Sequence, residues 1–316
     1  MKEKSFLSSA NKIMLGIMLL IIIIIVFLIA TWKKRNAVEV EIETDETAFE
    51  VETLDYVYYQ PIKDSDGDGK PYILVIGNNA LQCSDSDLLL PDYIEEQTGY
   101  KVDYLYADNT TFSEKVNPDL NLREWSAFSA VGLVDALISK DFSKQNDYKN
   151  TGVYVHGEEN KEYFNTLLNT IDLNEVDIIL FSYSLNDFFN GVPSGEIWEP
   201  SEPQRTFNGA LRHVIPALQE AYPHIRIMMS TPYLAYLRND DGTIQLASSM
   251  VVAHYNGSKM ASDIIDYSVE NNKFSVIDNY HYKITERNVT DYVDGFVLNE
   301  KGLKLVGDHI IEIINQ

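Results

Sequence analysis

The chain has 316 residues and carries 25 Lys and Arg against 48 Asp and Glu, a formal net charge of −23. This length allows one large or two modest domains, and 45% hydrophobic residues can bury a sizeable core. The excess of acids repels phosphate backbones, so nucleic acid is excluded as an expected partner. The single cysteine, Cys83, rules out an internal disulfide.

The first apolar segment predicts a membrane anchor. Every residue from 13 to 30 is apolar or Gly, and Thr31 and Trp32 extend the run to 20 residues, about 30 Å as a helix. A cleaved signal peptide has a shorter apolar region of about 7 to 15 residues. We therefore expect a short tail over 1–12 and an uncleaved transmembrane signal anchor over 13–32.

The charges that flank this segment leave its orientation nearly undecided, because three bases stand on each side: Lys2, Lys4 and Lys12 before it, and Lys33, Lys34 and Arg35 after it. The chain beyond residue 35 has a net charge of −28. Such an acidic chain lies poorly beside an anionic cytoplasmic leaflet. We expect a single-pass protein of the cell membrane with its main domain outside the cytoplasm.

Residues 33–70 are expected to form an acidic linker, because positions 39 to 55 hold eight acids and no base. A solvated stalk is the simplest interpretation. The alternation of Val38, Val40 and Ile42 with acids leaves an edge strand open as an alternative.

An aspartate-rich turn follows at Asp64, Asp66 and Asp68, which match the first half of a calcium-binding loop. The position that should supply a bidentate Glu is Val75, inside the next apolar run. A polar turn is therefore preferred to a calcium site, and neither a metal nor a cofactor is expected.

From residue 72 onward, short apolar segments alternate with longer segments of helical periodicity. The predicted strands are Ile73 to Ile76, Val102 to Tyr106, Val176 to Phe181, Ile225 to Ser230 and Phe274 to Ile277. The predicted helices are Leu88 to Gln97, Trp125 to Ile138, Pro203 to Ala221, Ser248 to Glu270 and Asn299 to Ile314. This alternation predicts an α/β domain over 71–316, a parallel sheet with helices on both faces. Its chemistry should lie at the carboxyl ends of the strands.

Five short strings fall at these strand ends or in the helices that follow. They are Gly77-Asn78-Asn79-Ala80, YSLNDFFNGVP at 183–193, TFNGALR at 206–212, LQEAYP at 218–223 and DGFVLNEKG at 294–302. Their order and spacing resemble the SGNH, or GDSL-type, hydrolases, in particular their membrane-anchored or secreted bacterial branch. The resemblance implies a three-layer, flavodoxin-like fold with a five-stranded parallel sheet.

Catalysis in that family needs a Ser after the first strand, a Gly amide after the second, an Asn after the third and an Asp-x-x-His pair before the last helix. The resemblance assigns these positions to Asn79, the region Tyr106 to Asn109, Asn186, and the pair Asp294 and Val297. A carboxamide is no nucleophile and a valine carries no proton, so the Ser and His functions are missing. The expected Gly is missing as well, and Asp294 is expected to cap the last helix instead.

Other residues keep alternatives open. Ser84 or Ser86 could serve as a displaced nucleophile, with His281, just after the last strand, as its base. Ligand contacts are expected from Asn79 and Asn186, and also from two aromatic residues near the sheet edge, Tyr183 and Phe188.

The resemblance therefore implies a membrane-anchored SGNH-hydrolase-like protein that is catalytically inactive. Its expected setting is the cell envelope, where it would bind acylated carbohydrate or assist an O-acyltransferase. An active esterase with a relocated Ser/His pair is the first alternative. A purely structural envelope spacer is the second.

Overall fold

The structure is a computed structural model and describes residues 52–64, 67, 69–114, 126–148, 157–195 and 203–316. The predicted tail, the predicted anchor over 13–32 and the alternation at 38–42 lie outside these residues. Within the described ranges, no helix has both the length and the apolar character that a membrane span needs. Residues 51–316 form one compact unit.

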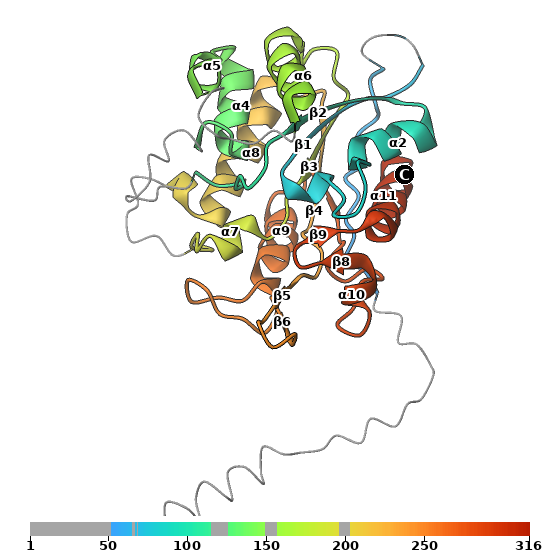
Figure 1. The fold of residues 1–316 in the computed structure, drawn as a ribbon. Helices are drawn as coiled ribbons and strands as arrows, with labels where there is room; N and C mark the ends of the chain where they lie inside the picture. Colours follow the sequence, from blue (N-terminus) through green and yellow to red (C-terminus); the bar gives the residue numbers. More distant parts are fainter. Residues whose placement is uncertain (1–51, 65–66, 68, 115–125, 149–156, 196–202) are drawn as a thin grey trace, which may run out of the picture. The chain divides into compact units, whose positions relative to one another are not determined.

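The centre of this unit is a five-stranded, wholly parallel sheet with the order β2-β1-β3-β4-β7 (Figure 1). Its strands are β1 (Tyr72–Gly77), β2 (Lys101–Tyr106), β3 (Ile178–Ser182), β4 (Arg226–Ser230) and β7 (Ser275–Ile277). All five strands were predicted from the sequence, and the α/β class is confirmed. Two small antiparallel ladders lie outside the sheet: β5 (Tyr236–Arg238) with β6 (Ile244–Leu246), and β8 (Val293–Asp294) with β9 (Val297–Leu298).

Helices cover both faces of the sheet. The α-helices are α2 (Leu90–Thr98), α4 (Ala130–Ser139), α5 (Ser143–Tyr148), α6 (Gly157–Thr170), α7 (Asn186–Phe189), α8 (Phe207–Ala221), α9 (Ser258–Glu270), α10 (Val289–Tyr292) and α11 (Glu300–Ile314). There are also two 3₁₀ helices in the described residues, η1 (Asn79–Leu81) after β1 and η2 (Pro203–Arg205) before α8.

The alternation of side chains along β1 divides the core into two layers. Leu74 and Ile76 pack with α4, α8 and α9, whereas Ile73 and Val75 pack with α2 and α11. All four side chains are fully buried, which is why β1 is a continuous apolar run rather than an alternating one. Figure 1 shows α2 and α11 on one side of the sheet and α4 and α8 on the other.

The helix starts have a local cause in the sequence. The side chains of Ser129, Thr206 and Asn299 precede α4, α8 and α11, and each accepts a hydrogen bond from the backbone amide of a glycine three residues later. Asn299 therefore caps the last helix itself, and the capping role expected for Asp294 is not needed.

The predicted helix over 248–270 is shorter in the structure, where α9 begins at Ser258. Gly257 lies against Ala247 so closely that an added Cβ would meet its side chain at 2.9 Å. The preceding turn contains Ala253 and His254, both with left-handed backbone. Periodicity alone could not distinguish this turn from helix.

Part of the segment expected as a linker packs on the domain. The residues from 54 to 58, here called the strap, run along the free edge of β7, where Tyr56 pairs antiparallel with Val276. The backbone amide of Leu54 also donates to a carboxylate oxygen of Asp278 over 2.8 Å. This contact ties the start of the described chain to the carboxyl end of β7.

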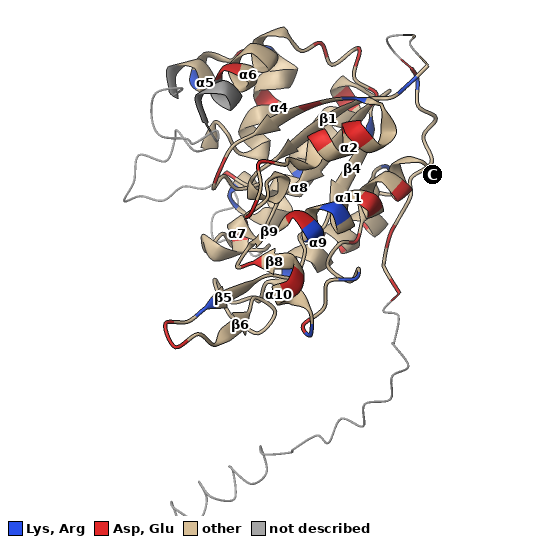
Figure 2. Ribbon diagram, turned by 45° about the vertical axis from the view of Figure 1, so that its right-hand side comes forward, with Lys and Arg blue, Asp and Glu red and all other residues tan. Residues whose placement is uncertain are grey.

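The charge excess is spread over the helices. Figure 2 shows acidic residues along α2 and α11, which include Asp92 and Glu95 on α2 and Asp308 and Glu312 on α11. An acidic surface of this kind favours solubility and opposes binding to polyanions.

Candidate functional site

The loop after β1 is held by a buried asparagine. The carboxamide oxygen of Asn78 accepts hydrogen bonds from the backbone amides of Ala80 (3.2 Å) and Ser184 (2.8 Å). Its amide nitrogen donates to the backbone oxygen of Thr110 over 2.8 Å. Asn78 therefore connects the chain segments that follow β1, β2 and β3, and fixes their relative positions.

The next residue, Asn79, to which the sequence resemblance assigned the nucleophile position, is only 5% exposed. Its Oδ1 accepts hydrogen bonds from the backbone amide of Asn109 (2.8 Å) and from Nδ2 of Asn186 (3.0 Å). Its Nδ2 donates to the carboxylate of Asp108 over 3.1 Å. Two donors that converge on one oxygen at these distances have the geometry of an oxyanion hole. Here the oxygen that fills it belongs to the protein.

The loop after β2 directs a backbone amide, that of Asn109, at Asn79 Oδ1. The φ of Asn109 is 57° and lies in the left-handed region, which Asn adopts more readily than most other non-glycine residues. The resemblance led us to expect a glycine in the region Tyr106 to Asn109. The asparagine at its end was the sequence signal for this backbone conformation.

The orientation of Asn186 is fixed by its neighbours. Its Oδ1 accepts a hydrogen bond from the Ser184 hydroxyl (3.0 Å), and its Nδ2 also donates to the Thr110 backbone oxygen (3.1 Å). Asn186 is 5% exposed and begins α7. Its amide hydrogens therefore point toward Asn79 and the loop after β2, the placement that an oxyanion donor requires.

Asp187 holds the loop after β2 against α7. Its buried carboxylate accepts hydrogen bonds from the backbone amides of Phe112 (2.7 Å) and Ser113 (3.0 Å) and from the Ser113 hydroxyl. Burial raises the pKa of Asp187, and these three hydrogen bonds act against the rise. The residue has no open face toward solvent, so its role is to position the loop.

Asp294 and Val297, the family acid and base positions, face each other across the β8–β9 ladder. The turn between them contains Gly295, whose φ of 67° suits glycine. Asp294 is exposed and Val297 is half-buried. At the position where the resemblance expected a histidine, this hairpin therefore carries an aliphatic side chain.

A histidine oriented by an aspartate exists at another strand end. Asp278 follows β7 and is fully buried, and its Oδ2 lies 2.8 Å from Nδ1 of His281. The carboxylate also accepts hydrogen bonds from the His281 backbone amide and the Thr231 hydroxyl, both over 3.3 Å. The Asp-x-x-His spacing at 278–281 was visible in the sequence, but the resemblance assigned that motif to residues 294–297.

Asn79 and the Asp–His pair follow strands that are not neighbours in the sheet. Gly77, Ser182, Ser230 and Ile277 pair in one register row across β1, β3, β4 and β7. Three inter-strand steps of about 4.8 Å separate the ends of β1 and β7 by about 14 Å. Within the described residues, no hydrogen bond joins Asn79 to His281.

The displaced nucleophiles also lie on the β1 side. The backbone amide of Ser84 donates to Leu298 in β9 over 2.8 Å, and Ser86 accepts a hydrogen bond from the amide of Leu88. Within the described residues, neither hydroxyl is hydrogen-bonded to His281. Burial raises the pKa of the neighbouring Cys83 thiol, which disfavours a thiolate at this position. The Ser84 or Ser86 pairing with His281 stays a prediction.

The two aromatic candidates for ligand contact lie in the interior. Tyr183 is 3% exposed and Phe188 is 0% exposed. Phe112 packs edge-to-face on Tyr183 at 5.4 Å between ring centroids, and Tyr255 packs on Phe188 at 5.5 Å. Both rings therefore contribute to the core layer beneath the site.

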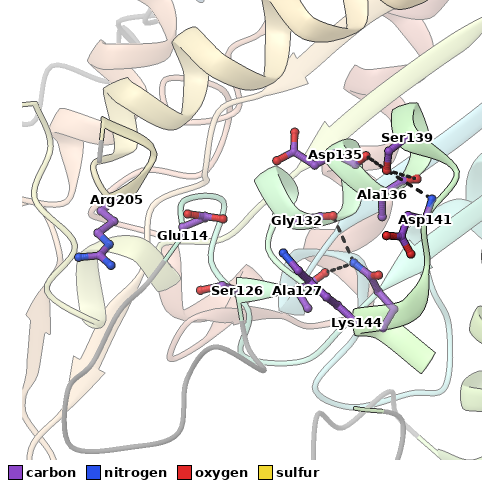
Figure 3. Close-up of a pocket in the computed structure, with 11 residues that line it drawn as sticks. Glu114, Ser126, Ala127, Gly132, Asp135, Ala136, Ser139, Asp141, Lys144 and Arg205 are labelled. Atoms are coloured by element: carbon purple, nitrogen blue, oxygen red, sulfur yellow. Dashed lines mark hydrogen bonds between the residues drawn. The ribbon is translucent and has the colours of Figure 1, made fainter. Parts of the chain in front are cut away.

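A cavity of about 530 Å³ lies beside α4 and α5, where its lining contains three acids and two bases: Glu114, Asp135, Asp141, Lys144 and Arg205 (Figure 3). Burial, and after it the Asp135 carboxylate, raises the pKa of Glu114. Across the described part of the chain, no three His, Cys, Asp or Glu side chains gather to hold a metal ion. The calcium prediction includes Asp66 and Asp68, which lie outside the described residues.

Comparisons with known proteins identify the fold. No family model and no curated protein sequence matches the chain. Among solved structures, a protein from Lactobacillus plantarum is 12% identical, with a TM-score of 0.50, over 78% of this chain and 97% of its own. A possible lipase from Chitinophaga pinensis is also 12% identical, with a TM-score of 0.49, over 78% of this chain and 98% of its own. Another crystal structure is 14% identical, with a TM-score of 0.55, over 78% of this chain and 96% of its own.

The structural neighbours are SGNH/GDSL-type esterases, acylhydrolases and lipases, and this chain has their fold, as the sequence predicted. At 12 to 14% identity the likeness establishes the fold alone. What the site does must be argued from its own residues.

Proposed function

We propose that this protein is a membrane-anchored, extracytoplasmic member of the SGNH-fold proteins that does not hydrolyse esters. It would bind acylated carbohydrate or assist O-acyl modification in the cell envelope. The single observation that carries this proposal is the position of Asn79 Oδ1 on the two oxyanion donors. A substrate carbonyl would have to displace it.

The chemistry of the site supports a non-hydrolytic role. Ester cleavage in this fold needs a nucleophile and a base within hydrogen-bonding reach of each other. The nucleophile position holds a carboxamide and the base position holds Val297. Removal of a triad Ser or His typically lowers turnover by about a millionfold.

The membrane assignment rests on the apolar run at 13–32, and the extracytoplasmic orientation on the acidity of the chain that follows it. Fusion of a periplasm-active or cytoplasm-active reporter to the C-terminus tests both. The proposal expects activity only from the reporter that works outside the cytoplasm, and the opposite result contradicts it.

Hydrolysis is tested on the full-length protein, purified in detergent, with p-nitrophenyl acetate and a fluorophosphonate probe. We expect the background rate and no labelling, identically in wild type and in Asn79→Ala. Turnover above background contradicts the proposal.

The Asp278–His281 pair specifically favours one second candidate, an active esterase with a relocated base. If turnover is found and disappears in His281→Asn, this second candidate replaces the first. Ser84→Ala and Ser86→Ala then identify the hydroxyl that it uses.

A further inference from the structure

A second cavity, of about 990 Å³, lies between the loop after α7, the first turn of α8 and the turn that precedes α9. Its polar lining consists of Ser194, Asn208, His254, Tyr255 and Lys259. Its volume falls at the upper end of the range of about 300 to 1,000 Å³ that is usual for small-molecule sites. The Asn79 site and the Asp278–His281 pair do not include these residues.

Among the described residues, the lining of this cavity contains two basic side chains, Lys259 and His254. Lys259 is held in place by Asp263, a 2% exposed residue that also accepts a hydrogen bond from the Ser194 hydroxyl. Because Asp263 is buried behind them, Lys259 and Ser194 form the part of the wall that a ligand meets.

The first turns of two helices border the cavity. Asn208 is the second residue of α8 and Lys259 the second residue of α9, helices of 15 and 13 residues. The first amides of α8 are already paired with protein oxygens, including that of Asn208 with the backbone oxygen of Ser194, so α8 contributes only the side chain of Asn208. The partial positive charge at the N-terminus of α9 favours an anion within its first turn. It has the same sign as the charge of Lys259.

The turn that presents His254 has an unfavourable backbone conformation. Ala253 and His254 have φ values of 49° and 71°, between Val252 and Tyr255, which pair with each other as an isolated bridge. A left-handed conformation costs a non-glycine residue about 1 to 2 kcal/mol, and such residues concentrate at ligand-binding sites. Within the described residues, the side chains of His254 and Asn208 make no hydrogen bond, so both are available to a ligand.

We propose that this cavity binds a sugar that carries an anionic group, either a carboxylate or a phosphate. Lys259, at the N-terminus of α9, would receive the anion, while Asn208, Ser194 and His254 would bind ring hydroxyls. Tyr255 supplies an aromatic wall, and its other edge packs on Phe188 beside Asn186. The inference rests on the proposed function for the choice of a carbohydrate as the ligand.

The test uses the full-length protein in a detergent without a sugar headgroup. Calorimetric titrations with D-glucuronate and with D-glucose 6-phosphate distinguish the two anion sources. D-glucose, acetate and inorganic phosphate serve as matched probes that lack either the charge or the ring. We expect at least one anionic sugar to bind tenfold or more tightly than each of these three.

Variants locate the binding. Lys259→Met should weaken it about tenfold or more, as expected for the loss of a charge-assisted hydrogen bond. His254→Asn and Asn208→Ala should each weaken it about threefold to tenfold. Asparagine tolerates the left-handed backbone at position 254, so His254→Asn keeps the fold even if Lys259→Met does not. The matched control is Lys273→Met, which removes an exposed lysine outside the lining and should change nothing.

Equal binding of D-glucose would overturn the anionic part of the inference, and equal binding of acetate or phosphate would overturn the sugar part. Binding that survives both Lys259→Met and His254→Asn would overturn the location, as would no binding at all. None of these results bears on ester hydrolysis, so the failure of this inference and that of the proposed function can be told apart.

Discussion

Asn79 makes three hydrogen bonds although the residue is only 5% exposed: its Oδ1 accepts from the backbone amide of Asn109 and from Nδ2 of Asn186, and its Nδ2 donates to Asp108. A typical hydrogen bond within a protein contributes about 0.5 to 1.5 kcal/mol to stability. The side chain that removes the nucleophile therefore also stabilises the loops that a hydrolase would keep open for its substrate.

Asn79→Ala should consequently lower the free energy of unfolding by about 2 kcal/mol, because it removes these three hydrogen bonds from a nearly buried site. Urea denaturation at neutral pH measures the change. The matched control is Asn272→Ala at an exposed asparagine, which should stay within about 0.5 kcal/mol of wild type. A loss as small as that of the control would mean that Asn79 does not fill the donors.

A second prediction concerns the left-handed residue that donates this amide. Asn109→Gly should keep the stability of wild type, because glycine adopts a φ of 57° without steric cost. Asn109→Ala should lose about 1 to 2 kcal/mol. Thermal or urea unfolding of the two variants side by side measures this, and equal stabilities would contradict the assigned backbone conformation.

At the scale of single residues, the sequence predicted which side chains stand at the positions that the resemblance assigned, but not what they contact. That Asn79 cannot attack an ester follows from its chemistry alone. That its oxygen lies on two donors depends on the loop conformation at Asn109 and on the orientation of Asn186, which arise from contacts between segments some 30 to 100 residues apart.

Among the elements, the strap is held to the edge of the sheet by a network around Asp55. Nε2 of His309 and the hydroxyl of Thr53 lie 3.0 and 2.6 Å from one carboxylate oxygen of Asp55, and the backbone amide of Asp278 donates to the other over 2.6 Å. Burial tends to raise the pKa of Asp55, but these hydrogen bonds outweigh it and hold the pKa below its ordinary value of 3.8. The strap is therefore most stably attached when Asp55 is ionised.

A carboxyl group whose pKa is lowered by folding contributes stability above its unfolded pKa and loses it as the pH falls through its folded pKa. Asp55→Asn should thus be less stable than wild type by about 2 kcal/mol at pH 7. The difference should shrink as the pH falls below about 4. Urea unfolding across this range measures it, with Asp240→Asn at an exposed loop position as the control. A difference that stays constant with pH would contradict the role of the ionised carboxylate.

The sequence predicted the elements of the central sheet well, because each buried strand is an uninterrupted apolar run such as Ile73 to Ile76. It predicted less well where two chain segments meet. The strap was expected to be a solvated linker, since its acids suggested solvent, whereas Asp55 is paired with His309, a residue 254 positions later in the chain. Periodicity could not reveal that contact.

In the whole molecule, the order of the strands places two groups of residues at different parts of the sheet edge: the donors around Asn79, and the Asp278–His281 pair. The ends of β2 and β3 carry the oxyanion-type donors, Asn109 N and Asn186 Nδ2, and the end of β7 carries the Asp278–His281 pair. Asn79 follows β1, whose end lies three strand spacings, about 14 Å, from the end of β7. We therefore expect a hydroxyl introduced at position 79 to lack a base.

Asn79→Ser alone should remain at the background rate with p-nitrophenyl acetate, because Val297 cannot accept its proton. Addition of Val297→His, three residues after Asp294, should raise hydrolysis above that background. The kinetic comparison of the single and double variants measures this. Turnover by Asn79→Ser alone that depends on His281 would contradict the arrangement of the sheet described above.

The most direct measurement is an experimental structure of the protein that resolves the side chain of Asn79. We expect its carboxamide oxygen to lie within hydrogen-bonding distance of both Asn109 N and Asn186 Nδ2. In the structure described above, these distances are 2.8 and 3.0 Å. A side chain turned away from an open pair of donors, with a serine or cysteine hydrogen-bonded to an imidazole nearby, would contradict the account.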